Sequence, residues 1–574
     1  MDRSDSRRVL GIEGTAWAAS AAVFETSDPT TRTDDERVRI HTDAYQPDSG
    51  GIHPREAAEH MHGAVPEMVA EALDTAREWA DENGESDTES PVDAVAFSRG
   101  PGLGPCLRIV ATAARATAQR LGVPLVGVNH MVAHLEIGRH RSGFDSPVCL
   151  NASGANAHVL GFRNGRYRVL GETMDTGVGN AIDKFTRHVG WSHPGGPKVE
   201  EHARDGEYIE LPYVVKGMDF SFSGIMSAAK QASDSGEAIE DICYSLQEHV
   251  FAMLTEVSER ALSLTGAGEL VLGGGVAQND RLRAMLESMC EQRGAEFYAP
   301  EPRFLRDNAG MIAVLGAKMY EAGDTIAIED SRIDANFRPD QVPVTWRENE
   351  SFTATRDSVR AGEAVQGAEA TVQIGADTVS KRRTPRTYRH PTLDERLRQT
   401  RTRLEARLTS EARRAGVPTP VIRDVDVQEG VLAVEYVGDA DLRERLTEAR
   451  VRDVGAHLAA IHDAGFVHGD PTTRHVRVAG GTTAGSAAER ERGDGGNRAR
   501  DARTYLIDFG LGYYTDDAED YAMDLHVFAQ SLTGTADDAS PLIEAATDAY
   551  RAASGQAEAV LSRLCEIEGR GRYQ

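Results

Sequence analysis

The chain has 574 residues, of which 40% are hydrophobic and 27% charged, and its formal net charge is −28. This length excludes a single small core, and the hydrophobic share excludes a disordered chain. The basic residues are 57 arginines and six lysines. An acidic surface poor in lysine predicts a protein that works in concentrated salt, with an ordinary acidic protein as the alternative.

The same composition argues against a membrane protein or a disulfide-rich one. No apolar run approaches the roughly 18 residues of a membrane span, and no signal-peptide core is present. The five cysteines are scattered and form no C-x-x-C pair. We therefore expect a cytoplasmic protein without a membrane partner.

Residues 1–340 alternate short apolar strands with helical stretches, which predicts α/β layers. Strands are expected at 9–12, 18–23, 38–45, 92–97, 125–128, 148–150, 158–162, 168–173, 269–272 and 296–298, and helices at 54–79, 106–120, 239–264, 281–292 and 308–322. Residues 341–361 are polar and predict a linker. A second α+β domain is expected over 362–574, with a low-complexity insertion at 480–501.

The segment GVNHMVAHLEIG places His130 and His134 four residues apart. On a helix both imidazoles face the same side and could share a metal ion. Two histidines on a helix surface are the alternative interpretation. No glutamate lies between them in the order H-E-x-x-H, so the pattern of a metallopeptidase is incomplete.

Three glycine-containing turns follow, at 151–155 (NASGA), 193–200 (HPGGPKVE) and 272–279 (LGGGVAQN). Backbone amides in such turns can approach a phosphate or a ribose, although ordinary turns look the same. Asp183 and Asp307 each stand near a predicted helix start, where helix capping is their alternative role.

Nine ordered blocks in the first 310 residues resemble the universal tRNA threonylcarbamoyltransferase family. They read GIEGTA, SRGPGLGPCLR, NHMVAHLEIG, NASGAN, GETMDTGVGNAIDKF, HPGGPKVE, FSFSGI, LGGGVAQND and RDNAGMIA. The family includes bacterial TsaD and the catalytic subunit of the KEOPS complex, and was once described as O-sialoglycoprotein endopeptidases. The resemblance implies a two-lobed fold of the actin, sugar-kinase and heat-shock-ATPase type.

The resemblance also implies the reaction and its residues. The threonylcarbamoyl group of threonylcarbamoyl-AMP would pass to the N6 amine of adenosine 37 of a tRNA, releasing AMP. His130, His134 and Asp307 would hold one iron or zinc ion. The substrate would contact Asn151, Ala152, Ser153, Gly154, Ala155, Asp183, Gly196, Glu200 and Asn279. Archaeal members usually carry tyrosine, a further metal ligand, where this chain has Asn151, whose side chain cannot supply a phenolate to the metal.

The second half carries five kinase-like features in order. They are the loop GAEA (367–370), Lys381, Glu405 in a predicted helix, Asp470 in HGDPTT, and Asp508 in D-F-G. Together with the tail EIEGRGRYQ they resemble the small atypical serine/threonine kinase of the KEOPS complex, which is fused behind the transferase in some archaea. Members often act as ATPases that support tRNA modification, and partners would include the other KEOPS subunits.

This second resemblance assigns ATP and Mg²⁺ to the second half. Lys381 would pair with the phosphates and with Glu405, Asp508 would bind magnesium, and Asp470 would accept a proton. The ATP-binding residues would be Gly367, Ala368, Glu369, Ala370, Thr371, Val372, Lys381 and Glu405. Three departures stand out: the loop is GAEA, no A-P-E follows D-F-G, and His475 stands in place of the usual magnesium-binding asparagine, where an imidazole nitrogen is a poor ligand for Mg²⁺.

A cluster of basic residues lies between positions 381 and 414. Its members are Lys381, Arg382, Arg383, Arg386, Arg389, Arg396, Arg398, Arg401, Arg403, Arg407, Arg413 and Arg414. Inside so acidic a chain, this clustering favours contact with tRNA phosphates, while a solvated helix balanced by carboxylates is the alternative. For the whole protein, a metallopeptidase and a non-catalytic nucleotide-binding scaffold remain the competing hypotheses.

Overall fold

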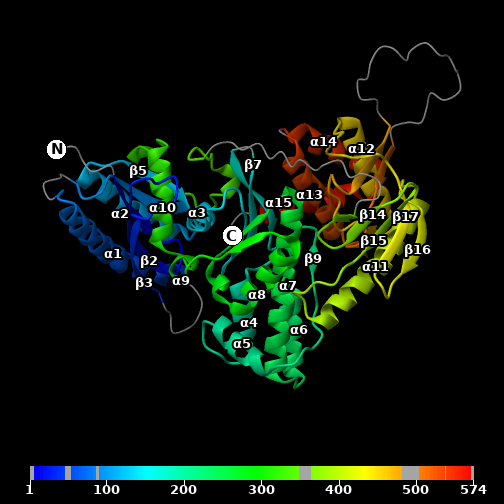
Figure 1. Cartoon of the computed structure of the whole chain (residues 1–574), viewed down its shortest axis with the longest axis horizontal. Coiled ribbons are helices and arrows are strands. Elements are labelled where there is room, and N and C mark those ends of the chain that lie inside the picture. The colour runs from blue at the N-terminus through cyan, green and yellow to red at the C-terminus, as the bar shows by residue number, and fades with distance from the viewer. Residues whose placement is uncertain are drawn as a thin grey trace, which may run out of the picture. The chain divides into compact units, whose positions relative to one another are not determined.

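The computed structural model describes residues 6–45, 53–85, 90–154, 156–163, 165–347, 364–480, 503–536 and 538–570. These residues form two compact units, shown in Figure 1. Unit 1 contains residues 6–214 and 219–347, and unit 2 contains 215–218 and 364–570. Ala155, residues 348–361 of the predicted linker and 481–501 of the predicted insertion lie outside the described residues.

The first sheet of unit 1 has five strands in the order β3-β2-β1-β4-β5. β1 pairs antiparallel with β2 and parallel with β4, β2 pairs antiparallel with β3, and β4 pairs parallel with β5. The bounds are β1 (Arg7–Glu13), β2 (Ala18–Thr26), β3 (Arg37–Ala44), β4 (Ala94–Gly100) and β5 (Leu125–Asn129).

The second sheet of unit 1 repeats this topology in the order β8-β7-β6-β11-β12. Again three consecutive strands pair antiparallel, and two later strands add in parallel. The bounds are β6 (Val148–Ala152), β7 (Ala157–Arg163), β8 (Arg166–Glu172), β11 (Glu269–Gly273) and β12 (Glu296–Tyr298). The expectation of mixed strands and helices is therefore confirmed, and the duplicated topology is new information.

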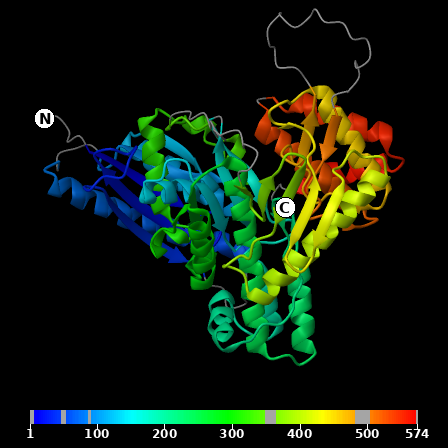
Figure 2. The same ribbon diagram turned by 45° about the vertical axis from the view of Figure 1, so that its right-hand side comes forward.

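Helices cover both faces of the first sheet, as Figures 1 and 2 show. Leu10 and Ile12 of β1 pack in one apolar cluster with α1 (Pro54–Glu82) and α2 (Gly104–Leu121). Val9 joins a second cluster with α10 (Ala309–Glu321) on the opposite face. A Cβ on Gly11 would lie 2.5 Å from the Ala309 carbonyl oxygen. Successive side chains of β1 therefore point to opposite faces of the sheet and enter two different cores. Because Gly11 has no side chain, α10 can lie close to the strand.

Unit 1 contains further helices, one short strand and short turns. They are α3 (His130–Ser142), α4 (Val178–His188), α5 (Gly196–His202), β10 (Asp219–Phe220), α6 (Ser223–Asp234), α7 (Ile239–Thr265), α8 (Asp280–Arg293), α9 (Pro302–Leu305), and the short turns η1 (Ala203–Asp205), η2 (Gly275–Gln278), η3 (Ile328–Asp330) and η4 (Pro339–Gln341). Val342, Val344 and Trp346, inside the predicted linker, are buried in the core that contains Val9. This end of the predicted linker is packed.

Unit 2 begins with an antiparallel five-stranded sheet in the order β13-β14-β15-β17-β16, next to helix α11 (Pro391–Arg414). A mostly helical part follows, with a core around Leu458, Phe466 and Phe528. The elements are β9 (Val215–Lys216), β13 (Ala364–Gln366), β14 (Thr371–Ile374), β15 (Thr378–Arg382), β16 (Ile422–Asp426), β17 (Val431–Glu435), β18 (Ala440–Asp441), α12 (Glu448–Asp463), β19 (Phe466–Val467), β20 (Val476–Ala479), β21 (Arg503–Leu506), β22 (Tyr513–Tyr514), α13 (Ala518–Thr535), α14 (Ser540–Ala553) and α15 (Ala557–Arg570).

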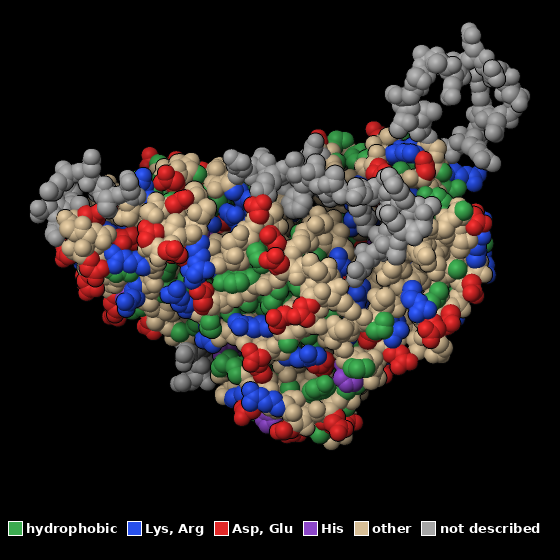
Figure 3. All heavy atoms as spheres, viewed as in Figure 1, with side chains coloured by type: hydrophobic (Ala, Val, Ile, Leu, Met, Phe, Trp, Pro, Cys, Tyr) green, Lys and Arg blue, Asp and Glu red, His purple; other side chains and the backbone are tan. Residues whose placement is uncertain are grey.

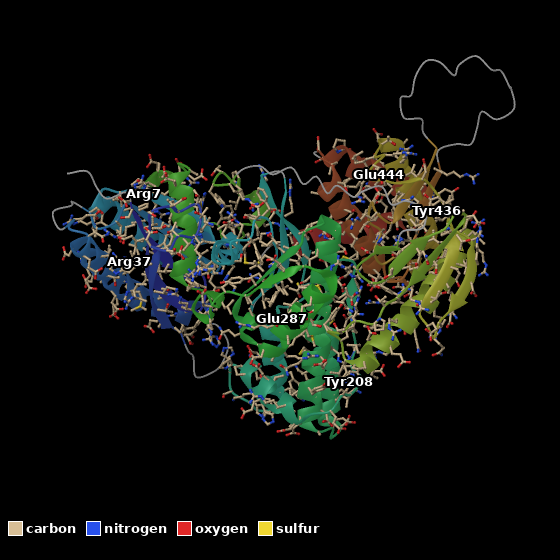
Figure 4. All side chains as sticks on the ribbon, viewed as in Figure 1. Arg7, Arg37, Tyr208, Glu287, Tyr436 and Glu444 are labelled. Atoms are coloured by element: carbon tan, nitrogen blue, oxygen red, sulfur yellow. The ribbon has the colours of Figure 1, made fainter. Side chains whose placement is uncertain are left out.

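Acidic and basic side chains are interspersed over the face shown in Figure 3. Arg37 of β3, labelled in Figure 4, is an example: its guanidinium pairs with Glu25 at 2.7 Å and with Glu82 at 2.6 Å. Among the described residues, no helix is both long and apolar enough to cross a membrane.

Candidate metal centre and nucleotide sites

Helix α3 begins where strand β5 ends, and this junction places the two histidines. Asn129, the last residue of β5, caps the helix because its side chain accepts hydrogen bonds from the amides of Met131 and Val132. His130 is therefore the first helical residue, and His134 lies one turn later on the same side. His130 is 7% exposed and His134 is 1% exposed, so the interpretation of two surface histidines is wrong.

Asp307 reaches the histidines from a distant part of the chain. It precedes α10, whose cap is Asn308. One Asp307 carboxylate oxygen, Oδ1, lies 3.3 Å from His130 Nε2 and 3.2 Å from His134 Nε2. One potential ligand atom from each of the three residues lies within 4.8 Å of the others. Two imidazole nitrogens and a carboxylate suit iron(II) or zinc, so the donor set fits such an ion.

Glu13, at the end of β1, orients one of these histidines. Its Oε2 lies 3.2 Å from His130 Nδ1, and its Oε1 accepts a hydrogen bond from the Thr15 amide. Glu13 is completely buried. Because an ionised carboxylate only accepts, it holds the proton on Nδ1 and leaves Nε2 turned toward Asp307. Sequence reasoning missed Glu13, which is 117 residues from His130.

Opposite charges offset one another among Glu13, Asp307 and the two histidines. Burial favours a neutral His130, but the carboxylates of Glu13 and Asp307 outweigh it and raise the pKa of His130 to about 10. Burial lowers the pKa of His134, and His130 adds to this. For Asp307 the burial penalty is overcome by the two histidines, which hold its pKa well below the usual range. Binding of a cation would therefore displace a proton.

Asn151 lies at the end of β6 and is 1% exposed. Its Nδ2 contacts the Met131 sulfur at 3.7 Å, and its Oδ1 has no hydrogen-bond partner among the described residues. A Cβ on Gly274 would lie 2.7 Å from this oxygen, so the glycine keeps the space beside it open. Asn151 thus offers an acceptor near the metal cluster, and its role stays a prediction.

Several of the predicted nucleotide-binding residues of unit 1 accept hydrogen bonds from the backbone amides of neighbouring elements. Gly154, in the turn after β6, accepts a hydrogen bond from the Asn180 amide of α4. Asp183 of α4 accepts one from the Gly195 amide at the start of α5. Glu200 of α5 accepts one from the Asp280 amide at the start of α8. The three glycine turns are therefore linked through α4, α5 and α8.

Two other predicted substrate-binding residues, Ser153 and Asn279, use their side chains in hydrogen bonds within the protein. Ser153 Oγ lies 2.9 Å from the Asn156 carbonyl oxygen, and Ala152 is buried at the end of β6. Asn279 caps α8 by accepting from the Arg281 and Leu282 amides, and its Nδ2 donates to Gln247 of α7. Gly196, the first residue of α5, follows the cap Gly195. Gln247 is a neighbour that the sequence analysis did not identify.

In unit 2, Lys381 of β15 meets two carboxylates. Its Nζ lies 3.0 Å from Glu405 Oε1 on α11 and 2.6 Å from Asp508 Oδ1. Asp508 has a φ of +67°, which is strained for a residue other than glycine and is typical of functional sites. Burial would raise the pKa of Asp508, but Lys381, with His475 and Arg383, lowers it far below its usual range.

Asp470 and His475 lie beside Asp508. His475 Nδ1 donates to the Asp470 carbonyl oxygen at 2.7 Å, and its Nε2 lies 3.7 Å from Asp508 Oδ2. The loop before Asp470 is held by Asp524 of α13, which accepts hydrogen bonds from the His468 and Gly469 amides. Asp524 is 3% exposed and was not identified from the sequence.

The loop 367–370 joins β13 to β14. The Gly367 amide donates to the Ala370 carbonyl oxygen at 2.8 Å, and Glu369 pairs with Arg401 of α11 at 3.0 Å. Arg386 donates to the Ala368 carbonyl oxygen. The next residues, Thr371 and Val372, start β14, and Val372 is the cross-strand partner of Lys381. The loop is thus tied to the strand and the helix that carry Lys381 and Glu405.

The cluster of basic residues between 381 and 414 is not a uniform RNA-binding surface. Four of its arginines are at most 7% exposed and pair with carboxylates or backbone oxygens, which contradicts their expected contact with tRNA. These are Arg383, Arg386, Arg389 and Arg401. Arg403, Arg407 and Arg414 are exposed on α11 and stay candidates for RNA contact.

The sequence is similar to that of a known protein family. The sequence profile described as tRNA N6-adenosine threonylcarbamoyltransferase matches residues 36–314. A protein of Haloarcula marismortui is 72% identical over 568 residues, 99% of this chain and 100% of that protein, and is named as a bifunctional tRNA threonylcarbamoyladenosine biosynthesis protein. A Methanosarcina mazei protein with the same name is 44% identical, covering 98% of this chain and 99% of that protein.

Similarity to solved structures is weaker. The crystal structure of HypF from T. kodakarensis has a TM-score of 0.38 and 15% sequence identity, and the match covers 57% of this chain and 50% of that one.

Proposed function

Because the chain belongs to the family of bifunctional tRNA threonylcarbamoyladenosine biosynthesis proteins, we propose that its two halves divide the work of one tRNA modification. The chain is an enzyme of tRNA modification. Residues 1–340 would carry the transferase, in an actin-like fold, and residues 362–574 an ATPase or serine/threonine kinase with a minimal kinase-like fold. The observation that carries this proposal is the cluster of His130, His134 and Asp307, in which both histidines are buried and which lies within the matched residues.

In the proposed transfer, the N6 amine of adenosine 37 attacks the carbamoyl carbonyl carbon of threonylcarbamoyl-AMP. A C–N bond forms, the bond from that carbon to the phosphate oxygen breaks, and AMP leaves with the electron pair while the amine loses a proton. A bound iron or zinc ion would supply Lewis-acid polarisation. His130, His134 and Asp307 would hold that ion, and Glu13 would keep His130 Nε2 directed at it.

The glycine turns of unit 1 would hold the adenylate part of this substrate. Backbone amides at the starts of α4 and α5 can face a phosphate without adding positive side chains. Asp183 and Glu200 fix these turns through the amides of Gly195 and Asp280. We assign the same role to Ser153, Gly154, Gly196 and Asn279, with Asn151 as an acceptor close to the metal.

A peptidase reaction has no support from the nearest glutamate in the sequence. Glu136 lies two residues after His134, but its carboxylate accepts hydrogen bonds from Tyr167 and from Lys318 in the interior. It is completely buried and salt-bridged, so it is not placed to activate water.

The second half is proposed to bind ATP with Mg²⁺. The observation behind this is the contact of Lys381 with Glu405 and Asp508 at distances of 3.0 and 2.6 Å. Lys381 would move to the phosphates, Asp508 would hold magnesium, and Asp470 would accept the proton of the attacking hydroxyl or water. Other KEOPS subunits are expected to bind the chain.

The proposal is tested by incubating the purified chain with threonylcarbamoyl-AMP and tRNA, with and without the other KEOPS subunits, and analysing the nucleosides by mass spectrometry. We expect N6-threonylcarbamoyladenosine and one AMP released per modified tRNA. A parallel reaction with ATP and Mg²⁺ should release phosphate only when Lys381 is intact. Lack of modified nucleoside in every mixture would overturn the transferase assignment, and turnover of casein by the pure chain would favour a peptidase.

A further inference from the structure

Arg383 is a buried arginine beside the proposed nucleotide site of unit 2, and the function proposed above assigns it no role. It lies directly after β15, two residues beyond Lys381, and is 2% exposed. Its Nη2 lies 2.6 Å from Glu405 Oε2, and its Nη1 donates to Thr402 Oγ1 at 3.2 Å. Both partners belong to α11, so Arg383 joins the strand that carries Lys381 to the helix that carries Glu405.

Glu405 therefore has two cationic partners. Lys381 Nζ lies 3.0 Å from one Glu405 oxygen and 3.1 Å from the other, while Arg383 contacts the second oxygen more closely. In the usual kinase arrangement the strand lysine is the partner of the helix glutamate. Here two cations share the carboxylates of Glu405 and Asp508, because Lys381 also contacts Asp508.

The D-F-G turn also makes room for Arg383. A Cβ added to Gly510 would clash with Arg383 Nη2 and lie 3.5 Å from Glu405 Oε2. The guanidinium thus fills the space that a side chain at position 510 would need. Three elements meet at this one group: β15, α11 and the turn that carries Asp508.

We propose that Arg383 is a positioning residue that keeps Glu405 paired when Lys381 turns to the phosphates of ATP. This inference rests on the proposed binding of ATP by unit 2. Glu405 is 5% exposed, and a buried carboxylate that loses its only cation is strongly destabilised. With Arg383 in place, Lys381 can leave Glu405 without that penalty. Helix α11 then stays in position although no A-P-E segment follows D-F-G.

The test uses the full chain and four variants. Arg383→Met removes the second cation, and Arg383→Lys keeps the charge but loses the planar fork. Gly510→Ala displaces the guanidinium without removing it. Arg452→Met is the matched control, because it breaks an arginine–glutamate pair on α12 with Glu448. The measurements are kcat and KM for ATP hydrolysis, the ATP dissociation constant by calorimetry, and the melting temperature.

We expect Arg383→Met to raise KM and the dissociation constant for ATP about tenfold, with kcat changed less than about threefold, because Glu405 then retains Lys381. Gly510→Ala should act in the same direction, Arg383→Lys should lie between, and Arg452→Met should match the wild type. Unchanged ATP affinity in Arg383→Met would overturn the proposal. So would a fall in kcat and melting temperature at constant KM, which indicates a structural role alone.

Two measurements on the wild type and on Lys381→Ala show separately whether unit 2 binds ATP at all. In that case the wild-type chain binds no ATP in calorimetry, and Lys381→Ala releases as much phosphate as the wild type. That result would remove the ATPase assignment and the role of Arg383 with it, whereas the Arg383 outcomes above require a wild type that binds ATP.

Discussion

Lys318 Nζ donates to Glu136 Oε2 at 3.0 Å in the interior of unit 1, where both side chains are at most 1% exposed. Lys318 belongs to α10, which begins two residues after Asp307, and Glu136 belongs to α3, which carries the two histidines. The pair therefore connects the helix that carries His130 and His134 with the helix that follows Asp307.

Removing one partner of this pair should be costly. Lys318→Met leaves the Glu136 carboxylate buried beside Tyr167 with less positive charge, which should lower the free energy of unfolding by about 3 kcal/mol. The double variant Lys318→Met/Glu136→Gln should recover only part of this loss, because it removes the buried carboxylate but leaves Arg139, which pairs with Glu136 at 3.3 Å, without that partner. Chemical denaturation in high salt measures both. Equal stability of Lys318→Met and the wild type would show that the pair contributes nothing.

Asp219 predicts a pH dependence of stability. Burial raises the pKa of its carboxyl to about 7, with the Glu172 carboxylate acting in the same direction. An unfolded aspartate titrates near 4, so between about pH 4 and 7 the folded chain holds a proton that the unfolded chain has lost. Stability from this group is therefore present below pH 4 and falls as the pH rises to 7.

Asp219→Asn should remove this loss, because an amide can still accept from the Glu172 backbone and carries no charge. We expect the variant to be more stable than the wild type at pH 8, on the order of 2–4 kcal/mol, and similar to it near pH 4. Asp74→Asn, at an exposed position of α1, is the control and should shift melting equally at both pH values. The prediction is contradicted if the difference in stability between Asp219→Asn and the wild type is the same at pH 4 and pH 8.

His475 should limit magnesium use by unit 2. Its Nε2 faces Asp508 at 3.7 Å, where a kinase asparagine would offer an oxygen. Imidazole is a poor ligand for Mg²⁺ and a better one for Mn²⁺. His475→Asn should raise Mg²⁺-dependent ATP turnover severalfold and reduce the advantage of Mn²⁺. Equal or lower turnover with Mg²⁺ would mean that His475 is no handicap.

The predicted insertion should be dispensable. Ala479 of β20 pairs with Arg503 of β21, so deletion of residues 481–501 would leave Gly480 and Ala502 as a two-residue hairpin connection. Gly480 already has a φ of +78°, as such a turn requires at its first position. We expect a melting temperature within about 2 °C of the wild type, since a short connection costs little entropy. Insoluble protein would contradict this.

Residue spacing and motif order in the sequence predicted part of each site. The spacing of His130 and His134 indicated a shared face, and the order of Lys381, Glu405 and Asp508 indicated a kinase-like site. Asp307, by contrast, came from resemblance to a family, because 173 residues separate it from His134. Glu13 and Asp524 act through contacts with distant elements and leave no local signal.

The arginines between 381 and 414 show why composition alone does not predict an RNA-binding surface. The sequence does not distinguish an exposed arginine from one that pairs with a carboxylate in the interior, and Arg383 and Arg401 form such pairs. Likewise α5 and α6 were not predicted as helices, and α4 was indicated only by the helix start expected near Asp183; each of these helices has at most 12 residues. Short helices depend on tertiary packing more than on their own sequence.

The central claim is that His130, His134 and Asp307 hold the metal ion on which tRNA modification depends. It is tested most directly by measuring threonylcarbamoyl transfer to tRNA and bound metal in the same samples of wild type, His134→Ala and Asp307→Ala, with Arg452→Met as the control. We predict that both site variants keep the fold by circular dichroism, lose the bound metal and lose transfer by at least about 100-fold, while the control retains both. A site variant that keeps stoichiometric metal, or that transfers at the wild-type rate without it, would contradict the account.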